Sequence, residues 1–467
     1  MAAIKTYQDF EKIPDYERKN FIHAFISEYK GTTQYRNAEI AYEYYCHRNA
    51  TINAYQKLLY KVTGDAIPDN WTANYKMSCR HFYRFVTQEV QYLLGNGVSW
   101  GKDDTEDKLG TKKLNFDRQL QDAAAKAKWG DVSYGFYNLD HVDVFSSLEF
   151  APLLDEYTGE LRAGVRYWQI DPNKPLHATL YEVDGLTNYV YDNEEDVTRA
   201  SRADEAKTGY KKDVETTEAD GDEITGQQNY KVLPIVPLWA NKEHQSEFIG
   251  LREQIDCYDL IKSGFANTVD EASIFYWTIQ NAGGMNDVDL AKFVQRMKTL
   301  HAAVVDGEAT AESHTMEAPY ASREALLDRL DKDLYRDAMA FDPDKIAGGA
   351  VTATQIKAAY EALNSKCDSF EYQVLDFING ILDVAEIEDE ATFTRSVIVN
   401  QSETISTILS AAEYLPDEYV TRKILEILGD GDQADELLGK MDADELNRFG
   451  NVTEPDNNDE DEEVDEE

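Results

Sequence analysis

The chain has 467 residues, of which 42% are hydrophobic, so it is long enough for two to four globular domains. Its 89 acidic and 46 basic residues give a net charge of −43, which excludes a surface that binds nucleic-acid phosphates tightly. Its four cysteines are far apart and form no CxxC pair, which indicates a reducing compartment without a disulfide framework. Neither a secretory signal nor a membrane-spanning run is expected.

From residue 1 to about 160 the pattern predicts mainly helices. In the stretch HFYRFVTQEVQYLLGNGVSW, Gly95 and Gly97 are expected to end one of them. Its apolar face, which also holds one acid, has helical spacing and is interpreted as core packing: Phe82, Phe85, Val86, Glu89, Val90 and Leu93.

A β-rich part follows. Three short stretches rich in Val, Tyr and Thr predict an antiparallel meander: GVRYWQI, LHATLYEV and LTNYVYD. The polar residues 192–228 predict an exposed loop or hairpin. Pro234 and Pro237 place the next strand at an edge or an end of a sheet, because proline cannot donate to a ladder.

The second half of the chain predicts long helices. One is expected over about 244–274 and another over 320–340, with a mixed α/β segment at 275–318 between them. A third, over about 352–385, has a near-heptad apolar stripe that we interpret as the buried face of a helix in a larger domain. Beyond it we expect one strand, FTRSVIVN (393–400), and short helices up to residue 450.

Motifs that carry enzyme chemistry are absent from the sequence. GNGVSWGKD lacks the first Gly and the final hydroxyl of a phosphate-binding loop. Cys79 and His81 lie two residues apart with no second pair at zinc spacing. We therefore predict no catalytic residues, no metal and no cofactor.

The order of elements between residues 232 and 385 is more informative. An edge strand (LPIVPLWANKE) precedes a long helix (LREQIDCYDLIKSGFANTVDEAS), a small α/β segment, a second helix (PYASREALLDRLDKDLYRDAMAFD), a Gly-containing loop and a long helix. This order resembles the portal protein family of tailed double-stranded-DNA bacteriophages, in the branch of the long-tailed phages. YLLGNGV and VIVNQSETI also resemble that family, and the likeness extends over roughly residues 30 to 450.

The resemblance implies an α+β portal fold, mainly helical, with a β-rich wing, long stem helices, a small α/β clip and a short helical crown. The implied boundaries are a wing at 1–243, a stem helix at 244–274, the clip at 275–318, a second stem helix at 319–341, the tunnel loop at 342–352, a long wing helix at 353–385 and the crown at 386–450. Two stretches depart from the usual family pattern: the acidic insertion 192–228 within the wing, and the acidic tail 451–467, which its composition predicts to be disordered.

The resemblance also implies a function. Subunits of this family form a ring, usually of twelve, at one capsid vertex, and DNA passes through the ring into and out of the head. The implied partners are that DNA, the terminase large subunit, head-completion or adaptor proteins, and the major capsid and scaffolding proteins, with no membrane. The protein would be a non-enzymatic part of the virion that is assembled in the host cytoplasm.

Two sets of site residues follow from the resemblance. The tunnel loop that would line the channel comprises Asp344, Lys345, Ile346, Ala347, Gly348, Gly349, Ala350, Val351 and Thr352. Docking at the clip would involve Asn281, Gly283, Gly284, Asn286, Lys292 and Arg296. The small residues of the loop suit a compact segment that shifts as DNA passes, and Lys345 is suited to transient phosphate contact.

Alternatives stay open at this stage. The loop has the composition of an ordinary helix connection with a Gly C-cap. The basic residues of the second stem helix are expected to form salt bridges between subunits rather than DNA contacts: Arg323, Arg329, Lys332 and Arg336. The other candidate functions are a different capsid-associated structural or scaffolding protein and a metal-dependent acidic nuclease.

Overall fold

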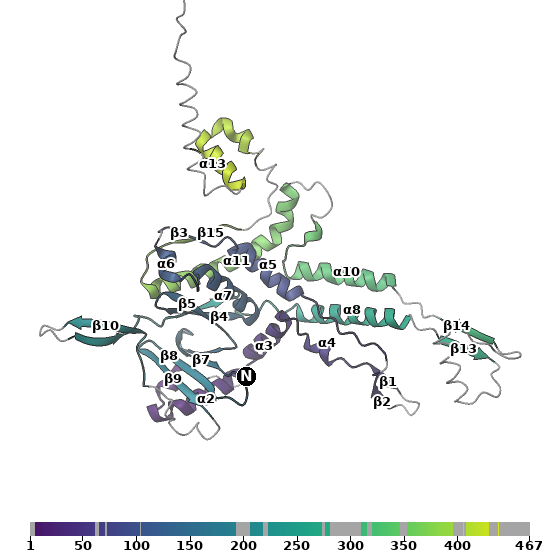
Figure 1. Cartoon of the computed structure of the whole chain (residues 1–467), viewed down its shortest axis with the longest axis horizontal. Helices are drawn as coiled ribbons and strands as arrows, with labels where there is room; N and C mark the ends of the chain where they lie inside the picture. Colours follow the sequence, from purple (N-terminus) through teal and green to yellow (C-terminus); the bar gives the residue numbers. More distant parts are fainter. Residues whose placement is uncertain are drawn as a thin grey trace, which may run out of the picture. The chain divides into compact units, whose positions relative to one another are not determined.

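The α+β class predicted from the sequence is confirmed by the computed structural model (Figure 1). The structure describes residues 5–60, 65–70, 72–102, 104–192, 206–217, 223–272, 276–280, 310–314, 320–345, 353–395, 405, 408–428 and 438. The chain divides into two compact units. One comprises Met1–Asp342 and Glu361–Ser396, and the other comprises Pro343–Tyr360 and Val397–Glu467.

The first unit begins with short, well-capped helices. Thr6 forms a capping box with Asp9, while Thr32 and Asn49 accept hydrogen bonds from the first turns of the next helices. The elements up to residue 130 are α1 (Tyr7–Glu11), α2 (Asp15–Lys30), α3 (Thr33–Tyr45), α4 (Ala50–Ala54), β1 (Leu58–Tyr60), β2 (Ala66–Pro68), α5 (His81–Leu94), β3 (Val98–Trp100), α6 (Thr105–Leu109) and α7 (Phe116–Gly130).

The prediction of mainly helical structure up to about residue 160 was wrong beyond Gly130, where two antiparallel sheets begin. One has the strand order β12-β4-β5 and the other the order β6-β7-β8-β9. Their strands are β4 (Val132–Asn138), β5 (His141–Ser146), β6 (Phe150–Leu154), β7 (Leu161–Trp168), β8 (Leu176–Glu182), β9 (Gly185–Tyr191) and β12 (Ile235–Trp239). The predicted meander is confirmed in β7, β8 and β9, and β12 is an edge strand as its prolines indicated.

The polar insertion contains a hairpin, which was one of the two predicted forms. Strand β10 (Lys211–Thr217) pairs antiparallel with β11 (Glu223–Gln228). Residues 193–205 of the insertion lie outside the described part of the chain. The hairpin is anchored where Tyr210 donates a 2.6 Å hydrogen bond to the Glu182 carbonyl at the end of β8.

A core forms where helix α2 covers the four-stranded sheet. Phe21, Ile22 and Phe25 lie in one apolar cluster with residues of β6 to β9 such as Leu153 and Leu180. Burying each of these side chains contributes about 1.5–3 kcal/mol to folding, as an upper figure.

Helix α11 (Ala353–Ala385) is the long helix predicted over 352–385, and its part in the first unit packs closely on the three-stranded sheet. Two glycines permit this approach. A Cβ atom at Gly135 in β4 would lie 2.5 Å from the Phe377 ring, and one at Gly380 would lie 2.6 Å from Val236 in β12. Larger residues at either position would push the helix away from the sheet.

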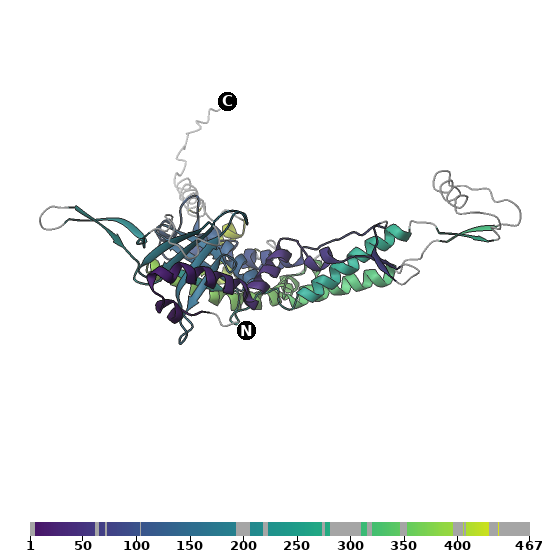
Figure 2. The same cartoon turned by 90° about the horizontal axis from the view of Figure 1, so that it is seen from below.

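Helices α8 (Arg252–Ala272) and α10 (Tyr320–Asp337) lie side by side, as both views show (Figures 1 and 2). The first begins at Arg252 rather than at the predicted 244, because residues 244–251 form turns that include positive φ at His244 and Gly250. Strands β13 (Tyr276–Gln280) and β14 (Thr310–His314) pair antiparallel.

The remaining described elements are short. Of the strand predicted at 393–400, Phe393 is the last residue of β15 (Ala391–Phe393), which pairs with β3, while Thr394 and Arg395 are not in a strand; residues 396–400 lie outside the described residues. In the second unit, the structure contains the 3-10 helices η2 (Pro343–Lys345) and η3 (Ala412–Tyr414) and the helix α13 (Asp417–Leu428). In the part of the chain that is described, no helix combines the length and apolarity needed to cross a bilayer.

Candidate functional site

The α8–α10 helix pair is fixed at both ends by hydrogen bonds between side chains. Arg323 near the start of α10 donates to the Gly264 carbonyl at 3.2 Å and to the Thr268 hydroxyl at 2.6 Å. At the opposite end, Gln254 of α8 donates to Asp337 of α10. The two helices are therefore antiparallel and form one rigid element.

A segment before α5 runs along α8 and is held by a ladder of side chains. Asp259, Ser263 and Asn267 accept hydrogen bonds from the backbone N–H groups of Cys79, Met77 and Tyr75, at 2.9, 2.9 and 2.7 Å. Four residues of helix rise about 6 Å, which is close to two residues of extended chain. The matching spacing lets every second N–H of the segment bond to one face of the helix.

The ladder continues into a polar cluster where α5 meets the helix pair. His81 at the start of α5 lies 2.7 Å from Asp331 of α10 and 2.8 Å from the Cys79 sulfur. Burial lowers the pKa of His81, although the Asp331 carboxylate opposes this shift. Burial and the neighbouring Asp259 raise the pKa of the Cys79 thiol to about 12.

This polar cluster suits a structural role better than catalysis or metal binding. A thiol with a raised pKa stays protonated at neutral pH and is a poor nucleophile or metal ligand. Among the described residues, no group of three His, Cys, Asp or Glu side chains is arranged to hold a metal ion.

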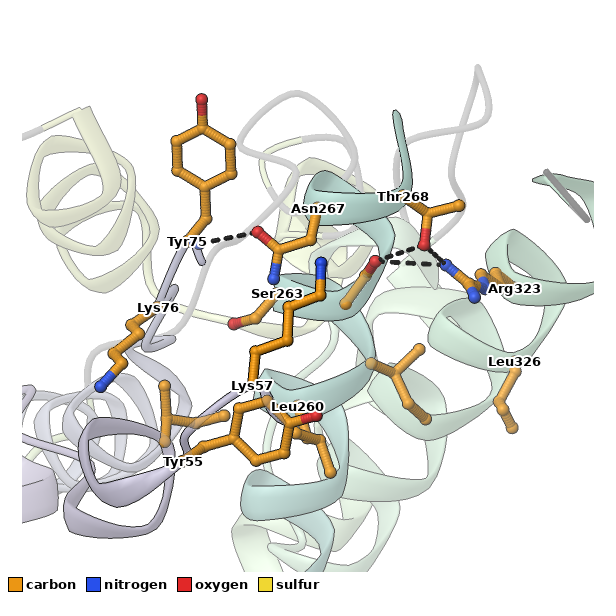
Figure 3. A pocket seen from close by; sticks show the side chains of 13 residues that line it. Tyr55, Lys57, Tyr75, Lys76, Leu260, Ser263, Asn267, Thr268, Arg323 and Leu326 are labelled. Atoms are coloured by element: carbon orange, nitrogen blue, oxygen red, sulfur yellow. Dashed lines mark hydrogen bonds between the residues drawn. The ribbon is translucent and has the colours of Figure 1, made fainter. Parts of the chain in front are cut away.

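A pocket of about 440 Å³ lies beside the ladder, between the helix pair and the residues at 52–57 and 75–76 (Figure 3). Its described lining contains three cationic side chains and no acidic one. The lining residues are Ile52, Tyr55, Lys57, Tyr75, Lys76, Leu260, Ile261, Ser263, Gly264, Asn267, Thr268, Arg323 and Leu326. Because acids outnumber bases almost two to one in the chain, this composition is unusual.

A second polar centre joins α5, α7, α11 and the segment before α8; Glu89 and Lys128 are fully buried in it, and Lys366 and Glu247 are largely buried. The Lys128 ammonium lies 2.6 Å from Glu89 and 3.4 Å from Glu247, and the Lys366 ammonium lies 2.9 Å from Glu89 and 3.1 Å from Glu247. Burial alone would raise the pKa of Glu247, but Lys366 and Lys128 lower it to about 2. Two positive and two negative charges therefore compensate one another in the core.

The chain is also fixed just before the predicted tunnel loop. The Gln88 side chain of α5 donates to the Phe341 carbonyl at 2.9 Å and accepts from the Phe341 N–H at 3.0 Å. Phe341 itself is buried. One amide group thus satisfies both backbone groups of Phe341 and holds the start of the loop in place.

Of the predicted loop residues, Asp344 and Lys345 lie at the surface in the 3-10 helix η2. The other seven lie outside the described residues: Ile346, Ala347, Gly348, Gly349, Ala350, Val351 and Thr352. All six predicted docking residues also lie outside them: Asn281, Gly283, Gly284, Asn286, Lys292 and Arg296. Both sets therefore remain predictions.

The arginines of α10 make contacts within the chain. Arg329 pairs with Asp333 at 2.7 Å, Arg336 pairs with the same carboxylate group at 3.0 Å, and Arg323 bonds to α8. Sequence reasoning missed the buried charge centre and the ladder. The one available indication was Glu89, an acid inside an otherwise apolar helical face.

Comparison with known proteins gives a consistent result. Residues 25–445 match the family model described as phage portal protein, SPP1 Gp6-like. A portal protein of Clostridium phage phiCD119 is 24% identical over 213 residues, which cover 43% of this chain and 46% of the relative. A portal protein of Bacillus phage SPP1 is 21% identical over 403 residues, which cover 78% of this chain and 75% of the relative. The match to the Clostridium protein thus spans less than half of that protein.

Solved structures with similar chains come from gene transfer agent (GTA) particles. A chain from the neck of an empty particle, computed with C6 symmetry, has a TM-score of 0.46 at 8% identity and covers 75% of this chain and 90% of that chain. A chain from the neck of the native particle, computed with C12 symmetry, has a TM-score of 0.41 at 10% identity and covers 74% of this chain and 89% of that chain.

Proposed function

The chain belongs to the SPP1 Gp6-like family of phage portal proteins, and on this basis we propose that it is one subunit of a ring that conducts double-stranded DNA through a capsid vertex. The family match over residues 25–445 supports this proposal. The ring, its usual number of twelve subunits and the passage of DNA in both directions are parts of the same proposal.

The structural observation that best supports the proposal is the anchored backbone that follows the α8–α10 pair. Helix α10 ends at Asp337, and Gln88 holds Phe341 through both of its backbone groups. A loop that contacts moving DNA needs such a fixed base, because a loose base would let the loop be dragged along. In our proposal residues 342–352 form this loop.

The negative charge supports a channel rather than a binding site. A net charge of −43 per subunit, repeated around a ring, gives a wall that repels phosphates and lets DNA slide. Lys345 lies exposed at the beginning of the proposed loop, where a single cation per subunit would contact phosphate only transiently.

We assign the protein a structural role, with ATP hydrolysis left to a separate terminase motor. The proposed docking region for that motor and for head-completion proteins is the segment 275–318. Support for this assignment comes from the match of the chain to a family of portal proteins. The proposed location is the portal vertex of the virion, after assembly in the host cytoplasm.

Negative-stain electron microscopy of the purified protein, with two-dimensional averaging, tests the proposal. We expect rings with a central hole and about twelvefold symmetry, at high protein concentration or with a scaffold protein added. Closed particles without a channel under both conditions would overturn the proposal. They would favour another structural role in the capsid or the acidic nuclease.

A further inference from the structure

We propose that the pocket beside the ladder receives the acidic face of α10 from the next copy of this chain, an inference that rests on the proposed ring. The pocket walls come from α8, α10 and the residues at 52–57 and 75–76 (Figure 3), and the Lys57 ammonium in its lining donates a 2.8 Å hydrogen bond to the Thr72 hydroxyl. Lys57, Lys76 and Arg323 give the pocket a positive lining in a strongly negative protein.

The cations of the pocket retain capacity for an anionic partner. The exposed Lys76 donates one hydrogen bond, 2.5 Å long, to the Asn53 carbonyl, and an ammonium has two further N–H donors. Arg323 uses its Nη1 for the two bonds to α8, and a guanidinium has five N–H donors in all. Both side chains are thus held in position by these bonds and keep further N–H donors that can bind an anionic partner.

The matching anionic surface lies on the same helix pair. Glu324 and Asp328 are four residues apart on α10, so their carboxylates share one helical face. Both are exposed, and neither has an ion-pair partner among the residues that the structure describes. A ring contact is formed by two different patches of one chain, and these two patches are complementary in charge.

The pocket favours a protein side chain over a DNA phosphate. Tyr55, Leu260 and Leu326 line it and are each more than two-fifths exposed, which suits a partner that brings apolar atoms as well as charge. A volume of about 440 Å³ accommodates several side chains that project from a neighbouring helix.

Charge reversal tests the contact. Lys76→Glu alone, and Glu324→Lys with Asp328→Lys, should each reduce the fraction of protein in rings, while the three substitutions together should restore it. Lys112→Glu and Glu243→Lys are the controls, since both residues are exposed and lie outside the pocket. Ring content is measured by native mass spectrometry, and circular dichroism verifies that each variant folds.

Cross-linking gives an independent readout. In a Cys257→Ser background, which removes the exposed native thiol, Lys76→Cys with Asp328→Cys should yield covalent multimers with a short bifunctional maleimide. Intact rings without such multimers, together with unchanged ring content in the reversed variants, would overturn the contact and leave the proposed function standing. Weaker binding of a short DNA duplex by Lys76→Glu rings of normal yield would assign the pocket to phosphates instead. The absence of any ring from the unmodified protein would overturn both proposals.

Discussion

The Lys128 ammonium lies 2.6 Å from a Glu89 carboxylate oxygen, and both side chains are only 1% exposed. Lys128 also donates to the Ala240 carbonyl at 3.0 Å and lies 3.8 Å from the centre of the Phe370 ring. This one side chain of α7 therefore links α5, α11 and the segment that follows β12. Charge balance in the core depends on Glu89 and Glu247, each of which contacts both Lys128 and Lys366.

Replacing Glu89 by Gln should destabilise the first unit by about 3–5 kcal/mol, because it leaves two buried ammonium groups facing one carboxylate. The measurement is the free energy of unfolding in urea at neutral pH. Glu89→Gln combined with Lys128→Met restores the charge balance and should recover part of the loss. A single variant as stable as the parent would show that the buried charges are not coupled.

Acid should unfold the protein partly through Glu247. Because Lys366 and Lys128 lower its pKa from 4.5 to about 2, the stabilisation is present above pH 4.5 and is lost as the pH falls toward 2. The contribution is of the order of 3–4 kcal/mol, at about 1.4 kcal/mol per pKa unit. Urea titrations should show that the deficit of Glu247→Gln relative to the parent shrinks between pH 5 and pH 2.5, while the exposed Glu243→Gln shows no such trend.

Asp131 should have the opposite effect of Glu247 on stability, because its ionisation destabilises the folded protein as the pH rises. Burial raises its pKa from 3.8 to about 7, despite hydrogen bonds from Gln34 and from the Val132 backbone. The folded state then holds a proton that the unfolded state has released, so stability falls as the pH rises from about 4 to 7. Asp131→Asn removes this penalty with a side chain of nearly the same shape, so it keeps the backbone conformation that Asp131 adopts, with φ of 74° and ψ of −38°.

The expected gain is of the order of a few kcal/mol at pH 8 and close to zero at pH 4. Thermal unfolding of Asp131→Asn and of the parent protein at both pH values measures it. An equal melting temperature at pH 8 would mean that the Asp131 carboxylate is compensated when it ionises.

Helices and strands whose burial alternates periodically along the chain were predicted correctly from the sequence. In α11, every position of the predicted apolar stripe is buried, because a helix packed on one side must repeat its apolar face. These positions are Ile356, Tyr360, Leu363, Cys367, Phe370, Val374, Ile378 and Ile381. The first three strands after Gly130, β4 to β6, were missed; β4 is buried along nearly its whole length and therefore lacks the alternation of a half-exposed strand. Helix α8 was predicted eight residues too long at its start, where turns replace the helix.

The polar sites depend on pairs that are distant in the sequence, which explains why they were not predicted. Glu89 meets Lys366 across most of the chain, and Asp259 meets the Cys79 backbone in the same way. A single sequence shows an acid in an apolar face but does not show which base neutralises it. The pocket is similarly assembled from three separated segments.

The ladder on α8 should control the mobility of the segment at 75–79. Ser263→Ala with Asn267→Ala removes two acceptors for backbone N–H groups, at about 0.5–1.5 kcal/mol each. Hydrogen exchange of the peptide that covers this segment should become faster, while the peptides of β7 and β8 stay unchanged. Ser27→Ala on the exposed face of α2 is the control, and unchanged exchange in the double variant would contradict the ladder.

The proposed tunnel loop gives the last prediction. Replacing Gly348 and Gly349 by Val should lower the amount of DNA packaged per head while rings remain intact, because β-branched side chains add bulk and restrict the backbone. Packaging yield in extracts supplied with each variant measures the effect, and microscopy verifies the rings. The matched control replaces both residues by Ala, which adds one methyl group at each position. Normal packaging by the Val variant would show that the loop needs neither small residues nor backbone freedom. The part of the ring that contacts the moving DNA would then lie elsewhere.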